Sequence, residues 1–88
     1  MLQTLRTALN KQALWCKDIV VLEENERFTV TPSQQSSRAA YIRCNKNGIK
    51  IQTNFKTRAQ SIPTRLAENP DTVGGEMSKL IEDLLIKV

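Results

Sequence analysis

The sequence predicts an α+β fold in which an antiparallel four-stranded β-meander is flanked by an N-terminal and a C-terminal helix. One apolar stripe at helical spacing opens the chain and another closes it, and alternating apolar and polar residues surround Asn47-Gly48 between them. The chain has 88 residues, 40% hydrophobic and 5% aromatic, which fits one small α+β domain spanning residues 1–88. So short a chain buries a thin core, which a partner chain could supplement.

The first predicted element is a helix over residues 2–16. Its apolar positions recur at helical spacing and form one stripe: Leu2, Leu5, Leu9, Ala13 and Cys16. We expect Trp15, beside that stripe, to cover an edge of the core. Residues 1–17 contain three cations and no acid, which is also typical of an organelle transit peptide. The single arginine and the short distance to the next strand favour a helix of the domain, although the targeting alternative stays open.

The first predicted hairpin pairs residues 19–23 with residues 27–31 around a three-residue loop. This register sets Glu23 opposite Arg27 and Leu22 opposite Phe28, whereas a two-residue loop would set Glu23 against Glu26. Like charges directly opposite each other destabilise a sheet, so the first register is preferred. Pro32 cannot donate to a ladder and ends the strand, and a polar loop follows over residues 33–37.

Asn47-Gly48 predicts the turn of a second hairpin, because both residues tolerate a positive φ. Lys46 then pairs with Ile49, and the pairing continues outward over residues 39–57. One face is apolar, and the other collects three polar pairs, Arg43 with Gln52, Tyr41 with Asn54, and Asn45 with Lys50. The separation of apolar and polar side chains supports this assignment of faces.

Two helix starts follow the second hairpin. Ser61-Ile62-Pro63 predicts a short helix with Pro63 at its first position, and Asn69-Pro70-Asp71 predicts the cap of the closing helix. The two consecutive glycines, at positions 74 and 75, should delay the regular part of that helix to about Glu76. Its stripe consists of Val73, Met77, Leu80, Ile81, Leu84, Leu85 and Val88.

The composition argues against an enzyme, a metal site, a cofactor and a membrane protein. The chain has no histidine, and its carboxylates form no arrangement that suggests acid–base catalysis. Cys16 and Cys44 lie far apart in the sequence, so they indicate no zinc site; one disulfide is arithmetically possible, but free thiols in a reduced compartment are favoured. No apolar run is long enough to span a membrane, and no secretory signal opens the chain, so we expect a cytoplasmic protein.

Charge is distributed in blocks along the chain. Residues 38–65 contain seven cations and no acid, whereas residues 66–88 contain two lysines and five acids. Most of these cations fall on or beside the polar face of the hairpin over residues 39–57, where Tyr41 offers a stacking surface. The candidate nucleic-acid-binding residues are Arg38, Tyr41, Arg43, Lys46, Lys50, Lys56 and Arg58.

This basic face leads to our preferred hypothesis, a small nucleic-acid-binding or nucleic-acid-associated regulatory protein, with RNA and DNA not distinguished. One side of an antiparallel sheet is often polar merely because it faces water, so a solvated surface is the simplest alternative. A protein adaptor is the rival class. It would be docked or homodimeric through the closing helix, with Leu85, Ile86 and Val88 as candidate partner-binding residues.

The order helix, antiparallel sheet, helix resembles double-stranded-RNA-binding domains and the small Alu-RNA-binding proteins of the signal recognition particle. The resemblance is one of topology; no motif carries it, and the predicted sheet has one strand more. It implies RNA as the ligand class, with no site residue attached.

Overall fold

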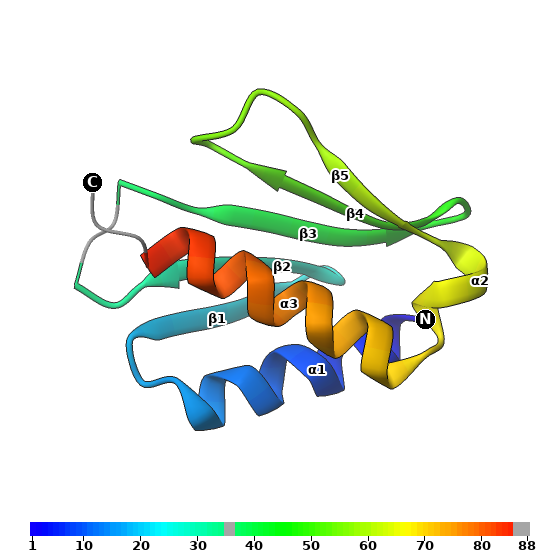
Figure 1. Ribbon diagram of the computed structural model, residues 1–88, viewed down its shortest axis with the longest axis horizontal. Helices are drawn as coiled ribbons and strands as arrows, with labels where there is room; N and C mark the ends of the chain where they lie inside the picture. Colours follow the sequence, from blue (N-terminus) through cyan, green and yellow to red (C-terminus); the bar gives the residue numbers. More distant parts are fainter. Residues whose placement is uncertain (35–36, 86–88) are drawn as a thin grey trace.

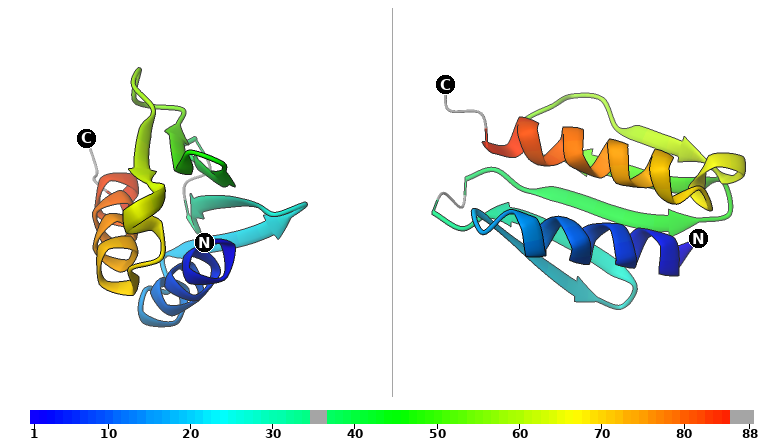
Figure 2. Two further views of the ribbon diagram at one scale, coloured as in Figure 1. Left: turned by 90° about the vertical axis from the view of Figure 1, so that its right-hand side faces the viewer. Right: turned by 60° about the horizontal axis from the view of Figure 1, so that its bottom comes forward.

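The computed structural model describes residues 1–34 and 37–85. It contains a five-stranded antiparallel sheet in the order β1-β2-β3-β4-β5, with α1 and α3 packed side by side on one face (Figures 1 and 2). The elements are α1 (Leu2–Trp15), β1 (Ile19–Glu24), β2 (Arg27–Pro32), β3 (Ala40–Asn45), β4 (Gly48–Thr53), β5 (Gln60–Pro63), α2 (Thr64–Ala67) and α3 (Pro70–Leu85).

The core lies between the sheet and the two long helices. The sheet contributes Phe28, Val30, Ile42, Ile49 and Ile51, the helices contribute Leu5, Leu9, Val73, Met77 and Leu84, and all are buried. This arrangement confirms the α+β class, the antiparallel meander and both terminal helices. The opposite face of the sheet carries no described helix, because α2 sits at one end of the sheet (Figure 2).

The sheet has five strands, so the predicted number of four is wrong. Residues 60–63 form β5, which pairs with β4 and buries Ile62, where the sequence suggested a helix start. Pro63 ends this edge strand, a position that tolerates the missing N–H group, and α2 begins one residue later. Gly48 permits the close approach, since a Cβ atom there would overlap the carbonyl oxygen of Ile62.

The register of the first hairpin differs from the prediction by one residue. Asn25 and Glu26 form a two-residue turn with φ of 52° and 63°, and Glu24 lies opposite Arg27. Such a turn, with positive φ at both central residues, matches the twist of the two strands. A one-residue shift exchanges the faces of a strand. Glu23 therefore faces the helices and bonds to Arg6, whereas Val20 and Leu22 lie on the uncovered face.

The second hairpin is shifted by two residues, which leaves its faces unchanged. Asn45 pairs with Gly48, so the turn residues are Lys46 and Asn47, and Asn45 Oδ1 accepts a bond of 2.8 Å from the backbone N–H of Asn47. Gly48, which follows the turn as the first residue of β4, has a positive φ of 128°, which only glycine adopts readily. The polar pairs become Arg43 with Lys50 and Tyr41 with Gln52.

The two long helices differ in two details from what we predicted from the sequence. Trp15 is 80% exposed and covers no edge of the core, because it points away from the buried stripe of α1. The helix α3 starts at Pro70, as the cap at Asn69 predicts, and Asn69 Oδ1 accepts bonds from the N–H groups of Asp71 and Thr72. It is regular through both of its glycines, so the prediction that its regular part begins near Glu76 is wrong. Two of the loop residues predicted over 33–37, at 35 and 36, lie outside the described residues.

Candidate functional site

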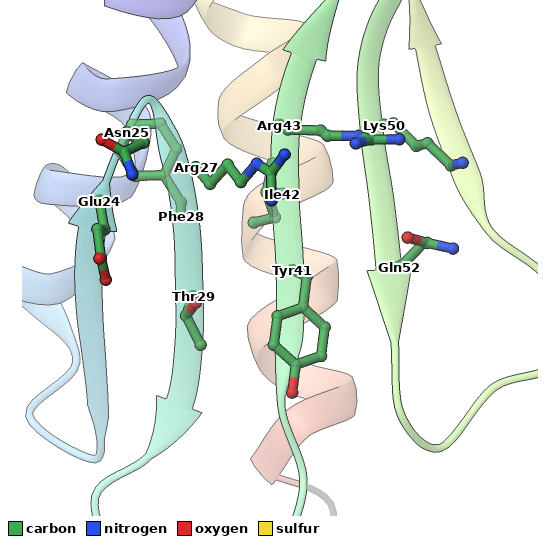
Figure 3. A pocket seen from close by; sticks show the side chains of 10 residues that line it. All are labelled: Glu24, Asn25, Arg27, Phe28, Thr29, Tyr41, Ile42, Arg43, Lys50 and Gln52. Atoms are coloured by element: carbon green, nitrogen blue, oxygen red, sulfur yellow. The ribbon is translucent and has the colours of Figure 1, made fainter.

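The face of the sheet opposite α1 and α3 carries most of the polar strand side chains, and we call it the open face. Strand alternation assigns it one set of side chains, from Val20, Leu22, Glu24, Arg27, Thr29, Thr31, Tyr41, Arg43, Asn45, Lys50, Gln52, Ser61 and Pro63. Ten residues around its centre line a shallow depression of about 460 Å³, including Arg27, Tyr41 and Arg43 (Figure 3). Glu24 is the one carboxylate in this set.

Three cations lie side by side across the central strands of the open face. Arg27 on β2 lies directly opposite Arg43 on β3, which in turn lies directly opposite Lys50 on β4. Figure 3 shows their side chains following one another across the strands, while Glu24 extends along β1, away from Arg27. We call Arg27, Arg43 and Lys50 the cation row.

The cation row has no anionic partner in the described part of the chain. Its three side chains make no ion pair and no side-chain hydrogen bond with any residue in 1–34 or 37–85. Like charges directly opposite in a sheet are destabilising, by about 0.2–1 kcal/mol for each pair when compared with neutral partners. The row therefore lowers the stability of the fold, which an anion bound across it would reverse.

Tyr41 lies beside the cation row and presents its ring to solvent. It is 49% exposed, with Thr29 opposite it on β2 and Gln52 opposite it on β4. An exposed ring flanked by a hydroxyl and an amide can stack on a planar group while its neighbours donate or accept hydrogen bonds. The open face thus combines fixed positive charge, one aromatic platform and neutral polar groups.

No family model matches this chain. No curated protein and no solved structure shows significant similarity to it either.

Four of the predicted cations lie outside the row. Lys56 Nζ donates to Asp83 Oδ2 on α3 at 2.5 Å, and Arg38 donates to the backbone oxygen of the same aspartate at 3.0 Å. Arg38 also stacks over the ring of Phe55, with 4.9 Å from Cζ to the centroid. Both side chains therefore lie at the contact between the end of the sheet and α3. Lys56 is not on the basic face where we predicted it, and Arg38, predicted to flank that face, bonds to α3 instead. Lys46 is at the hairpin tip and Arg58 in the β4–β5 loop, and both are exposed.

Arg27 is the site residue that sequence reasoning missed. It lies outside the acid-free block of residues 38–65, and only the β2–β3 pairing brings it opposite Arg43. Of the predicted partner-binding residues, Leu85 is half-buried against the core at the end of α3. Ile86 and Val88 lie outside the described residues, so their prediction remains untested.

Other polar groups of the described chain form local contacts. Arg6 bonds to both carboxylate oxygens of Glu23, at 2.9 and 2.7 Å, which lowers the pKa of Glu23 and raises the pKa of Arg6. Cys16 and Cys44 are both free, and burial raises the pKa of the Cys44 thiol. Within residues 1–34 and 37–85 no cluster of ligands suits a metal ion, and no helix is long and apolar enough to cross a membrane.

Proposed function

We propose that this chain is a small, non-enzymatic nucleic-acid-binding protein that holds a single strand across the open face of its sheet. The observation that carries the proposal is the cation row, in which three cations face one another without a described acidic partner. A phosphate backbone is a ligand that would neutralise all three at once. Adjacent strands are about 4.8 Å apart, so the row spans about 10 Å and its flexible side chains can reach neighbouring phosphates.

Tyr41 favours a single strand over a duplex. Its exposed ring can stack on a base only where that base is unpaired, and Gln52 and Thr29 can then bond to the base or the sugar. A duplex would present mainly its phosphate backbone to the sheet, because its bases are paired and stacked. RNA and DNA remain alternatives within this proposal, since neither the cation row nor the ring distinguishes a 2′-hydroxyl.

Salt dependence gives the test a quantitative form. Three phosphate contacts to a single strand should give a slope of log affinity against log salt of about −2. The titration uses labelled single- and double-stranded RNA and DNA at several salt concentrations. Arg43→Gln should weaken binding and reduce the slope by about 0.7, whereas Arg58→Gln, which removes the same charge from a loop outside the row, should leave the slope nearly unchanged. Absence of binding to all four ligands at low salt would refute the proposal, as would equal effects of the two variants.

We further propose a cytoplasmic location, which the two free thiols support. Free cysteines persist in compartments that keep thiols reduced. Oxidant-induced pairing of Cys16 with Cys44 in the purified folded protein would argue against this assignment.

A further inference from the structure

The two edges of the sheet differ in how well they are protected against pairing with another chain. The β5 edge is only four residues long, polar at Gln60 and Ser61, and ends in Pro63. The β1 edge has six residues, Ile-Val-Val-Leu-Glu-Glu, in uninterrupted register with β2. It contains no proline and no bulge, and its charged residues, Glu23 and Glu24, stand at its end, so its first four residues have none of the features that usually block edge-to-edge association. The outer edge of β1 can therefore form backbone hydrogen bonds with a strand of another chain.

Exposed apolar side chains gather at the same edge. Among the described residues, the large exposed hydrophobic side chains are Leu14, Trp15, Val20, Leu22 and Tyr41. The first two end α1 and the next two lie on β1, and only a three-residue connection separates these elements. Figure 1 and Figure 2 show α1 running along the β1 side of the molecule. Leu22 is 62% exposed, an unfavourable state that an added strand would relieve.

We propose that β1 pairs antiparallel with β1 of a second copy of this chain, so that two five-stranded sheets join into one. A second copy fits because the strand is self-complementary: its apolar middle, Val20 to Leu22, meets itself when two copies run in opposite directions. In this register Asp18 lies opposite Glu24 of the other copy and Lys17 lies opposite Asn25, so the charges beside the apolar segment do not favour the pairing. The apolar pairing and the backbone hydrogen bonds therefore carry the association.

The pairing has a consequence for the geometry of the assembly. A two-fold axis perpendicular to the sheet places both open faces, and therefore both cation rows, on the same side of the dimer. It also brings Leu14 and Trp15 of one copy near the end of β1 in the other. The inference uses residues that the proposed nucleic-acid site does not use, and it stands if that site binds nothing.

Light scattering on nucleic-acid-free protein tests the inference over a range of concentrations. The expected mass is twice the chain mass of 10.0 kDa. Leu22→Lys should raise the dimer dissociation constant at least tenfold without unfolding the chain, because its side chain is already largely exposed. Val20→Lys provides a second disruption on the same strand. The matched control, Gln60→Lys, adds the same charge to the exposed β5 edge and should leave the dimer intact.

Three results would overturn the proposal. One is a monomer at every concentration, and another is a dimer that Leu22→Lys and Val20→Lys leave unchanged. The third is a dimer that dissociates in the Leu85→Asp variant but not in the Leu22→Lys and Val20→Lys variants, which would show that the dimer forms through α3.

Hydrogen exchange adds a readout specific to strand pairing. Amides of β1 should exchange more slowly as the protein concentration rises, whereas amides of β5 should not change. Exchange in β1 that is independent of concentration would contradict the proposal even if a dimer forms. Because both experiments omit nucleic acid, their failure leaves the proposed binding function to its own titration.

Discussion

Replacing Arg43 with glutamine should make the folded protein more stable while it weakens binding to nucleic acid. Arg43 is the middle member of the cation row and lies directly opposite a cation on each side, Arg27 and Lys50. Its removal abolishes both like-charge pairs at once. Glutamine keeps part of the aliphatic stem and a polar end, so the exposed surface changes little.

The magnitude follows from the two pairs. Each directly opposed like-charge pair destabilises a sheet by about 0.2–1 kcal/mol, so their removal should return about 0.4–2 kcal/mol at low salt. The shorter stem of glutamine offsets part of this gain, and we expect a net increase of about 0.5–1 kcal/mol in the free energy of unfolding. For a domain of this size, that corresponds to a rise in Tm of about 2–8 °C. The gain should shrink with added salt, because exposed charges are screened.

Thermal unfolding followed by circular dichroism at low and high salt measures this effect. Wild type, Arg43→Gln and Arg58→Gln should be compared at one protein concentration, because any dimer makes Tm depend on concentration. Arg58→Gln lowers the net charge equally but removes no facing pair, so its Tm should stay close to that of wild type. An Arg43→Gln protein that is less stable than wild type at low salt, by an amount that salt does not change, would refute the reasoning.

Three further predictions concern single contacts. Gly48→Ala should lower the free energy of unfolding, measured in urea, by about 2 kcal/mol or more, because Gly48 has a φ of 128° and an alanine Cβ there would overlap β5. Gly74→Ala should instead raise the free energy of unfolding by about 1 kcal/mol, because a Cβ at position 74 meets no atom within 4 Å and alanine favours a helix more than glycine does. The lowered pKa of Glu23 means that its bond to Arg6 stabilises the fold above the unfolded pKa of about 4.3. That contribution should vanish as the pH falls through the lower folded pKa, so melts of wild type and Glu23→Gln should converge at acidic pH; a constant gap would contradict it. Lys56→Gln should lower stability by less than about 1 kcal/mol and leave the salt slope of nucleic-acid binding unchanged, because its partner lies on α3; a reduced slope would place Lys56 in the binding site.

Local patterns predicted most of the secondary structure. The apolar stripes located both long helices, and the Asn69 cap located the start of α3 to the residue. The alternation of residues 40–53 assigned Tyr41 and Arg43 to the correct face although the register was two residues off, because a shift of two preserves the face. These features depend on neighbours in the sequence.

The register and the number of the paired strands could not be predicted from local patterns of this kind. The first hairpin adopts neither of the two registers considered from the sequence, and the one-residue difference from the preferred register decided that Leu22 is exposed and not buried. The strand β5 exists because Gly48 lets residues 60–63 approach β4, a fit that a four-residue segment does not reveal by itself.

The sequence alone determined an α+β chain with an acid-free central block and two amphipathic helices, since periodicity and composition are properties of the chain. Only the tertiary structure decided which cations act together. In the folded chain Lys56 and Arg38 bond to Asp83 on α3 and so lie outside the cation row, whereas Arg27, from the first hairpin, lies opposite Arg43. The physical reason is that charges interact through space, and distances in space depend on the order and register of the strands.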